Sequence, residues 1–336
     1  MLHTADAIER CLLDAHGITA ALDDRTEESV GVDNQLFVAT LDAASMKETG
    51  WPTQVVVRVG WNANSIGTAA RVERMMAWCV ERGYPVVPIL AHGELDGTGY
   101  LVMPLIDAEP SIGILRGPWR APILCDRIAS LLSRLHSLDP AGWPGPTLTA
   151  DSALADAVRA GSAVPGVAPM LEWLTEHRRL ADDSGEPSVC HLDLHPMNVL
   201  WKWGTDPVVI DWDTAALAPP AADIAFSVEL TSIGGATVPS RIVRTASLSV
   251  GRSLAATTLI RYRRREDVDP DALRWWRALL LMQATMWARS ITVMGVAPRP
   301  EASAAVPPQF DATVARRFGF VTGRTVPSPS AAIMRA

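Results

Sequence analysis

The hydrophobic pattern of this 336-residue chain changes once, near residue 106. Before that point, stretches rich in β-branched residues alternate with stretches of helical periodicity, and after it apolar residues recur almost only at helical spacing. A strand-rich first part followed by a helical second part favours an α+β protein with two lobes. We therefore predict three regions: residues 1–105, residues 106–296, and a Pro- and Ala-rich tail at residues 297–336.

The first region is predicted to hold an antiparallel sheet with helices beside it. Two β-branched runs joined by a Gly- and Pro-marked connection are typical of a hairpin. Two more strands follow an internal helix whose apolar residues fall at i, i+3, i+4 and i+7. Strands are expected at residues 35–42, 53–60, 86–95 and 99–106, and helices at residues 4–16 and 68–82.

The second region is predicted to be mainly helical. A leucine-rich helix ends at Asp139-Pro140, because the residue before a proline is disfavoured in a helix. Two short β-like pieces interrupt the helices around residues 190–211. Further helices are expected at residues 151–160, 168–182, 241–262 and 271–294.

Composition excludes several classes of function. The formal net charge of −7 argues against a nucleic-acid partner, since binding nucleic acid requires a basic face. None of the four cysteines forms a C-x-x-C pair, which indicates neither a zinc site nor a disulfide framework and fits a reducing compartment. The most apolar helical run, residues 278–288, is shorter than the roughly 20 residues that span a bilayer. We expect a cytoplasmic protein with no membrane partner, and its oligomeric state stays open.

Titratable chemistry is concentrated in the stretch HLDLHPMNVLW, residues 191–201, which VIDWD follows at residues 209–213. Asp193, Asn198 and Asp211 supply two carboxylates and one amide, and such oxygen ligands suit magnesium held together with substrate phosphates. Protein kinases use the order H-x-D-x-x-x-x-N, followed by a second aspartate, for a catalytic base and two metal ligands. The spacing therefore predicts phosphoryl transfer.

The wording of these motifs resembles the aminoglycoside phosphotransferase family, a small-molecule branch of the protein-kinase-like fold, in which H-G-D-x-H-P-x-N-x-L and I-D-W recur. The resemblance covers roughly residues 30–295 and implies an antiparallel-sheet N-lobe, a mainly helical C-lobe, ATP or GTP as the nucleotide, and Mg²⁺. By this resemblance Asp193 is the catalytic base, Asn198 and Asp211 bind magnesium, and His191 is a structural member of the loop. Asp223, in PPAADIAFSVEL, matches a later family aspartate that braces the loop.

The same resemblance puts the nucleotide-binding residues in the first lobe. Arg58, in VVVRV, stands where protein kinases carry a lysine that holds the phosphates. Glu73 in the following helix is the best ion-pair partner for it, although another alignment puts Val72 there. Asn34, in VGVDNQLF, would form a short phosphate cradle in place of a G-x-G-x-x-G loop, and Met103 would lie at the hinge that binds adenine.

The acceptor is expected to be a small molecule. The segment between Asp211 and Asp223 is short, whereas protein kinases need a long activation segment there to dock a polypeptide. Asp213 and Glu229 are candidates for the acceptor side or for a structural role, and both alternatives stay open.

The leading hypothesis is ATP-dependent phosphorylation of a hydroxyl on an aminoglycoside-type antibiotic, another antibiotic or an amino sugar, with antibiotic resistance as one outcome. The first alternative is a metabolic sugar or choline-type kinase of the same fold. The second is a catalytically silent kinase-like module that binds nucleotide. Arg58 and the missing glycine-rich cradle motivate the silent module.

Overall fold

The computed structural model describes residues 3–22, 34–111, 118–162, 164, 166–182, 185–238, 240–288 and 309–328. The chain divides into two compact units, Met1–Ala108 with Val208–Asp213 and Glu109–Pro207 with Thr214–Ala336. The division after Ala108 lies close to the change of pattern near residue 106. The return of Val208–Asp213 to the first unit is a feature that the pattern does not predict.

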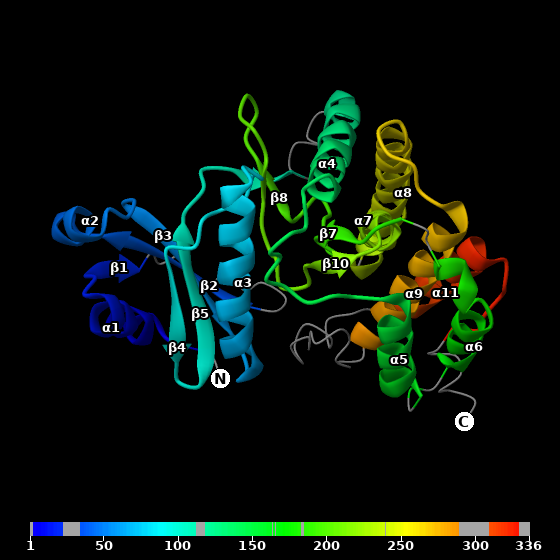
Figure 1. Cartoon of the computed structure of the whole chain (residues 1–336), viewed down its shortest axis with the longest axis horizontal. Coiled ribbons are helices and arrows are strands. Elements are labelled where there is room, and N and C mark those ends of the chain that lie inside the picture. The colour runs from blue at the N-terminus through cyan, green and yellow to red at the C-terminus, as the bar shows by residue number, and fades with distance from the viewer. Residues whose placement is uncertain are drawn as a thin grey trace. The chain divides into compact units, whose positions relative to one another are not determined.

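The first unit is built on a five-stranded antiparallel sheet in the order β1-β2-β3-β5-β4 (Figure 1). A hydrophobic core on one face includes Val55, Val57 and Val59 of β3 together with residues of helix α1. Because side chains alternate along a strand, Arg58 points to the opposite face. The elements are α1 (Ala5–His16), β1 (Ala20–Leu22), β2 (Asn34–Leu41), β3 (Gln54–Gly60), β4 (Ala91–Leu95) and β5 (Thr98–Pro104).

Two further helices belong to the first unit, α2 (Ala43–Thr49) and α3 (Asn64–Glu81). α2 fills the connection between β2 and β3, where the sequence indicates only a polar link. Asp42 caps α2 by accepting a hydrogen bond from the Ser45 backbone N–H over 2.7 Å, and Gly50 ends the helix with a left-handed φ of 70°. A helix this short has no apolar repeat, so periodicity cannot find it. α3 contacts β4 and β5.

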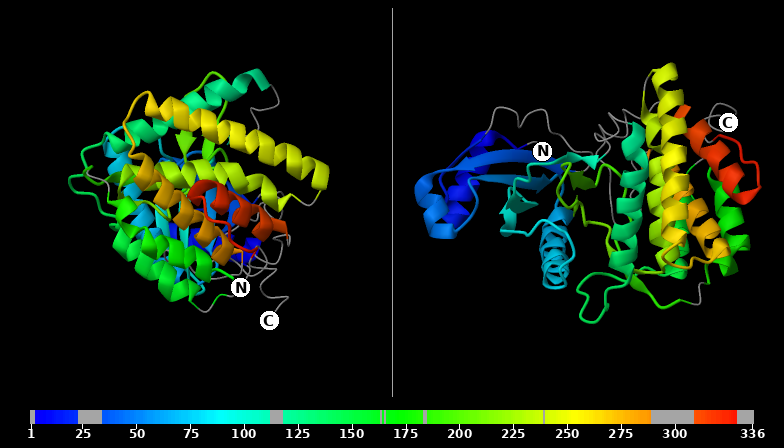
Figure 2. Two further views of the ribbon diagram at one scale, coloured as in Figure 1. Left: turned by 90° about the vertical axis from the view of Figure 1, so that its right-hand side faces the viewer. Right: turned by 90° about the horizontal axis from the view of Figure 1, so that it is seen from above.

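The second unit is mainly helical (Figure 2). β7 (Ser188–Cys190) pairs antiparallel with β10 (Ala216–Ala218), and β6 (Glu109–Pro110) with β8 (Val199–Trp201). β9 (Val208–Val209) lies in the segment that returns to the first unit. The helices are α4 (Ala121–His136), α5 (Ala150–Gly161), α6 (Ala168–Glu176), α7 (Pro220–Ile233), α8 (Arg241–Arg263), α9 (Pro270–Trp287) and α11 (Gln309–Thr322), with 3-10 turns at Pro118–Arg120, Arg178–Ala181 and Gly234–Thr237.

Helix α7 has no counterpart among the helices expected from the sequence. Eleven of its residues are buried, and it contacts both α8 and α9. A helix enclosed on all sides has no polar face, so its sequence lacks the amphipathic period that identifies surface helices. α7 is nevertheless central to the unit, because it carries Asp223 and Glu229 into the interior.

Part of the predicted tail forms a helix. Residues 297–308 and 329–336 lie outside the described residues, but Gln309–Thr322 form α11, which packs on α9 (Figure 2). Val314 and Phe318 of α11 are fully buried. The helix could not be recognised from the sequence, because the proline and alanine content of the whole tail does not indicate a helical stretch. α11 therefore belongs to the core of the second unit.

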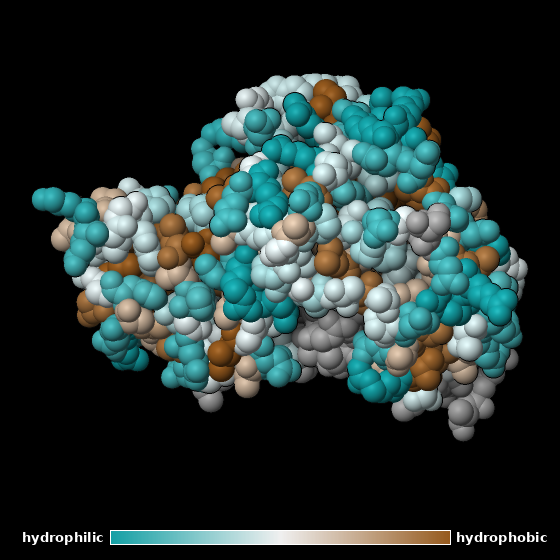
Figure 3. All heavy atoms as spheres, in the orientation of Figure 1, coloured by the Kyte–Doolittle hydropathy of each residue, from teal (hydrophilic) through white to brown (hydrophobic). Residues whose placement is uncertain are grey.

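The visible surface is mainly polar. In the face drawn in Figure 3 hydrophilic residues predominate, and the hydrophobic ones form small separate groups. Among the described residues, no helix combines the length and the apolar character needed to cross a membrane.

Candidate active site

The stretch from His191 to Asn198 forms the loop between β7 and β8 in the second unit. The buried side-chain amide of Asn198 donates to the Asp193 carbonyl over 2.9 Å and to Asp193 Oδ2 over 2.7 Å. The Asn198 backbone N–H donates to the His195 carbonyl over 2.9 Å, which closes the loop. The Asp193 side chain is 29% exposed. The loop thus presents one fixed and solvent-accessible carboxylate, which is the geometry a general base needs.

Asp223 holds the start of this loop from the fully buried interior of α7. Its Oδ2 accepts from the His191 backbone N–H over 2.9 Å and its Oδ1 from that of Leu192 over 2.8 Å. His136 Nε2 donates to Oδ2 over 3.0 Å. Burial raises the pKa of the Asp223 carboxyl, but the hydrogen bond and charge of His136, with the charge and backbone N–H of His191, outweigh it and the pKa lies below its usual value. Asp223 is therefore an ionised, immobile acceptor.

Leu192 departs from the family wording, which has glycine at this position. Its φ is 61°, in the left-handed region that costs an L-residue about 1–2 kcal/mol. The side chain is 1% exposed, and burying a leucine contributes about 1.5–3 kcal/mol, so side-chain burial offsets the backbone strain. The two hydrogen bonds to Asp223 hold the loop in this conformation.

The two histidines of the loop have different surroundings. His191 is fully buried; its Nδ1 accepts from the Asp193 backbone N–H over 3.2 Å and its carbonyl accepts from Thr214 Oγ1 over 2.9 Å. His195 Nδ1 accepts from the Met197 backbone N–H over 3.2 Å, and its Nε2 lies 3.5 Å from Asp193 Oδ1. Burial and the nearby His191 lower the pKa of His195 to about 4. His195 is therefore neutral at pH 7.

Asp211 and Asp213 lie in the first unit, where both contact Arg58. Arg58 Nη2 donates to Asp211 Oδ1 over 3.0 Å, and Nη1 and Nη2 donate to Asp213 Oδ1 and Oδ2 over 2.9 and 2.6 Å. Asp211 has a left-handed φ of 67°. The intervening Trp212 is fully buried, edge-to-face on Tyr84 with ring centroids 5.7 Å apart. This turn and the buried indole direct both carboxylates to the same guanidinium.

The other residues predicted for the nucleotide lie on the same unit. Asn34 begins β2 opposite Gly60, Met103 lies on β5 opposite Val56, and Glu73 is half-buried on α3. Residues 30–33 of the expected phosphate cradle lie outside the described residues. The ion pair of Arg58 with Glu73 stays a prediction.

Glu229 lies at the centre of an ion cluster inside the second unit. Its side chain is fully buried; Oε1 accepts from Arg277 Nε over 2.6 Å and from Arg317 Nη2 over 3.0 Å, and Oε2 accepts from Arg317 Nε over 2.7 Å. The two arginines come from α9 and α11. A carboxylate enclosed by two guanidiniums of its own chain is not available to a cationic acceptor, so the geometry favours the structural alternative. Its partners are distant in sequence, and no local pattern indicates the cluster.

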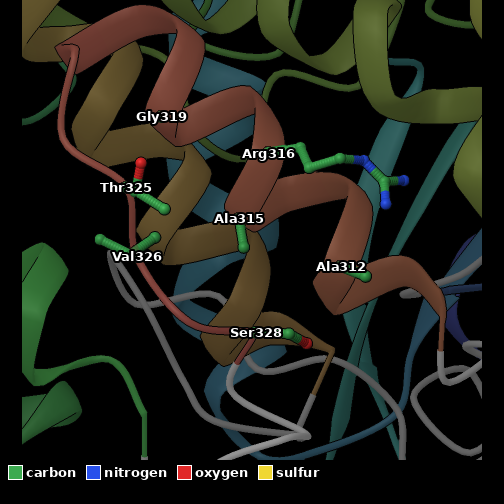
Figure 4. A pocket seen from close by; sticks show the side chains of 7 residues that line it. All are labelled: Ala312, Ala315, Arg316, Gly319, Thr325, Val326 and Ser328. Atoms are coloured by element: carbon green, nitrogen blue, oxygen red, sulfur yellow. The ribbon is translucent and has the colours of Figure 1, made fainter.

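A pocket beside α11 shares no residue with these groups. Figure 4 shows that small side chains and one arginine line it, which is not a catalytic set. Its lining residues are Ala312, Ala315, Arg316, Gly319, Thr325, Val326 and Ser328. The candidate residues are therefore Asp193 and Asn198 on the β7–β8 loop of the second unit, and Arg58, Asp211 and Asp213 in the first unit.

An antiparallel-sheet unit, a helical unit and the H-x-D-x-x-x-x-N loop together define the two-lobe architecture of the protein-kinase-like fold. The model of the phosphotransferase enzyme family matches residues 30–276, which is more than half of the chain. The chain therefore belongs to the phosphotransferase enzyme family. It is a small-molecule kinase, which uses an alcohol group as acceptor. No curated protein matches the chain.

Solved structures share the fold at low identity. An aminoglycoside phosphotransferase from Streptomyces rimosus in complex with ADP and streptomycin is 20% identical, with a TM-score of 0.56 over 83% of this chain and 99% of that chain. Choline kinase from Streptococcus pneumoniae is 14% identical, with a TM-score of 0.57 over 94% and 99%. A Plasmodium vivax ethanolamine kinase is 11% identical, with a TM-score of 0.58 over 94% and 89%. The α+β two-lobe fold predicted from the sequence is confirmed.

Proposed function

We propose that this phosphotransferase transfers the γ-phosphoryl group of ATP to a hydroxyl of a small cationic molecule. The observation that carries the proposal is the Asp193–Asn198 pair, in which a buried amide fixes a solvent-accessible carboxylate through two hydrogen bonds. Asp193 then orients the acceptor hydroxyl and takes its proton as the oxygen attacks the γ-phosphorus. His191 and Asp223 hold the loop that carries it.

The oxygen donors of the site fit magnesium. The amide nitrogen of Asn198 is turned toward Asp193, so the amide oxygen is the atom that a hard cation would bind, and the Asp211 carboxylate is 37% exposed. Asn198 and Asp211 would hold the ion, which neutralises charge on the nucleotide phosphates when bound.

The first unit would bind the nucleotide. Arg58 would pair with phosphate oxygens, because a guanidinium offers a planar fork of donors that matches phosphate. Asn34 would contact the phosphates from the start of β2, and Met103 would meet the adenine through its backbone at the end of β5. Solved structures of the fold that hold ADP or AMP support the binding of a nucleotide. GTP is the alternative that the sequence leaves open.

The acceptor that we propose carries an amino or ammonium group beside its hydroxyl. Solved neighbours are named for aminoglycosides, spectinomycin, choline and ethanolamine, which share this chemistry. The net charge of −7 favours encounter with a cation. An aminoglycoside-type antibiotic or amino sugar is the first candidate, and an amino alcohol is the second.

The test is ATP consumption by the full chain across aminoglycosides, spectinomycin, other antibiotics, amino sugars, choline and ethanolamine. Each acceptor is assayed with magnesium, with a chelator and against a no-acceptor control, and GTP replaces ATP in a parallel series. We expect one acceptor class to raise turnover only when magnesium is present. No stimulation by any acceptor, with magnesium nucleotide still bound in calorimetry, would favour the silent binding module instead.

A further inference from the structure

The ion cluster of Arg58, Asp211 and Asp213 points to a specific role for Asp213. We infer that Asp213 is the positioning residue for Arg58: its carboxylate, rather than that of a glutamate on α3, holds the guanidinium in place for the nucleotide phosphates. The inference rests on the proposed function, since it concerns the site that binds ATP. All three residues belong to the first unit.

The geometry of the cluster distinguishes the two aspartates. Asp213 accepts two parallel hydrogen bonds, from Nη1 over 2.9 Å and from Nη2 over 2.6 Å, one to each carboxylate oxygen. Asp211 accepts a single bond of 3.0 Å from Nη2. The bidentate fork is the strongest arrangement of an arginine with a carboxylate, and it also fixes the plane of the guanidinium. Asp213 is therefore the principal anchor of Arg58, and Asp211 is the secondary contact.

Both partners of the fork stand on rigid structure. Arg58 lies in the central strand β3, which is paired with β2 on one side and β5 on the other. Asp213 follows the fully buried Trp212, whose Nε1 donates to the Val209 carbonyl over 3.3 Å. The Arg58 side chain is 11% exposed and that of Asp213 is 22% exposed. An ion pair between pre-ordered and partly desolvated groups loses little side-chain entropy and is only weakly screened.

Helix α3 turns a cation toward this cluster. Arg71 Nη2 lies 3.4 Å from the Asp213 backbone carbonyl. Glu73 is two positions further along α3, and two positions correspond to a rotation of about 200° around a helix. Residues i and i+2 do not share a helix face, so the side of α3 that reaches Asp213 is the side opposite to Glu73. In protein kinases a glutamate of this helix pairs with the cation of the strand, whereas here the carboxylate that accepts from Arg58 is that of Asp213.

Asp213 then acts on the nucleotide side of the reaction and not on the acceptor side. Loss of its charge should reduce the affinity for the nucleotide and leave the affinity for the acceptor unchanged. Incoming phosphate oxygens compete with Asp211 for the bond from Nη2, whereas the fork to Asp213 keeps the guanidinium in place.

The test is the affinity of the full chain for MgADP, measured by calorimetry for Asp213→Asn, Asp213→Glu, Glu73→Gln and Glu81→Gln. Glu81 is an exposed acid at the end of α3 and serves as the matched control. We expect Asp213→Asn to weaken MgADP binding about tenfold, the size of coupling between contacting charged groups. Asp213→Glu should restore part of the loss, and Glu73→Gln should change the affinity less than about twofold. In an Arg58→Lys background, Asp213→Asn should reduce the MgADP affinity by a smaller factor, because a lysine cannot form the two parallel hydrogen bonds to Asp213.

Each other outcome has a definite meaning. An Asp213→Asn variant that binds MgADP as tightly as the wild type, or more tightly, overturns the inference, and so does a larger loss in Glu73→Gln. An unchanged melting midpoint of the variant shows that a loss of MgADP affinity is not caused by misfolding. If Asp213→Asn does not fold, the MgADP affinity of Asp213→Glu, measured alone and in the Arg58→Lys background, decides the question. Once an acceptor is known, the KM values of Asp213→Asn for the acceptor and for ATP can be compared. A raised KM for the acceptor with an unchanged KM for ATP would place Asp213 on the acceptor side. A wild type that binds neither MgADP nor MgATP overturns the proposed function itself, which is a distinct result.

Discussion

At the scale of single residues, the site depends on side chains whose charge is set by their neighbours. Asp223 is held ionised by His136 and by backbone N–H groups, although it is fully buried. His195 is held neutral although a carboxylate lies 3.5 Å away. The imidazole beside Asp193 is therefore uncharged at pH 7.

The neutral state of His195 makes the fold sensitive to mild acid. Its pKa of about 4 lies below the ordinary value of 6.5, so the unfolded chain takes up a proton first as the pH falls. The stabilisation is complete above pH 6.5 and is lost between pH 6.5 and about 4. We expect His195→Asn to reduce the loss of unfolding free energy between pH 7 and pH 5 by about 2 kcal/mol, measured by urea unfolding. Equal losses in the variant and the wild type would contradict a partly buried, neutral imidazole. Asp223 does not contribute to this pH dependence, because its pKa is lowered and its carboxyl group therefore takes up a proton only below this pH range.

Asp211 is predicted to make nucleotide binding depend on magnesium. Asp211→Ala removes a proposed ligand of the ion, so we expect the gain in ADP affinity that magnesium gives the wild type to disappear. Calorimetry with ADP in the presence and absence of magnesium measures this gain directly. If the variant keeps the full gain, Asp211 does not bind the ion.

Much of the site could be predicted at this scale because the chemistry lies within one short stretch of chain. Asp193, Asn198 and Asp211 are recognisable by type and spacing alone. The anchor of Arg58 could not be predicted in this way, since the contact joins residues 155 positions apart. The left-handed φ of Leu192 is also absent from the pattern, because only its departure from the family glycine hints at it.

At the scale of elements, α7 connects the candidate site to the helical core. Asp223 in its first turn holds the β7–β8 loop, and Glu229 further along binds α9 and α11 through Arg277 and Arg317. The resemblance indicates the role of Asp223, but the helix itself and the partners of Glu229 are not indicated, because a helix buried on all sides shows no amphipathic period. Helices with one apolar stripe, such as α1 and α4, could be predicted for the opposite reason.

The ion cluster of Glu229 is predicted to be essential to stability. Glu229→Gln leaves two partly buried guanidiniums without their counter-charge, and breaking a buried ion pair in this way costs about 3–5 kcal/mol. Glu172→Gln is the control, since Glu172 forms an exposed pair with Arg324 that is worth at most about 1 kcal/mol. Urea unfolding of the two variants measures the difference. A Glu229→Gln variant as stable as Glu172→Gln would show that the cluster is not needed.

At the scale of the whole molecule, the two units have separate cores, and the chain passes between them more than once. The sequence indicates a boundary near residue 106, because strand-like stretches become rare after that point and helical spacing dominates. It does not predict the return of Val208–Asp213, since two short β residues and a turn carry no domain signal. It also does not reveal α11, whose contacts with α9 are long-range.

Removal of α11 is predicted to destabilise the second unit. A chain that ends after residue 288 loses the buried Val314 and Phe318 and the Arg317 partner of Glu229. We expect the free energy of unfolding to fall by at least about 3 kcal/mol, because large buried side chains and one half of a buried ion cluster are lost together. A chain that ends after residue 328 keeps α11 and is the reference in the same urea titration. Equal midpoints for the two chains would contradict the assignment of α11 to the core.

The central claim is that Asp193 takes the proton of the acceptor hydroxyl during phosphoryl transfer. It is tested most directly by single-turnover transfer of labelled γ-phosphate from ATP to the acceptor found in the turnover assay, with wild type, Asp193→Asn and Asp193→Ala. We expect a loss of about 10²–10⁴ in rate for both variants, with MgADP affinity unchanged. A variant that transfers phosphate at the wild-type rate would contradict it.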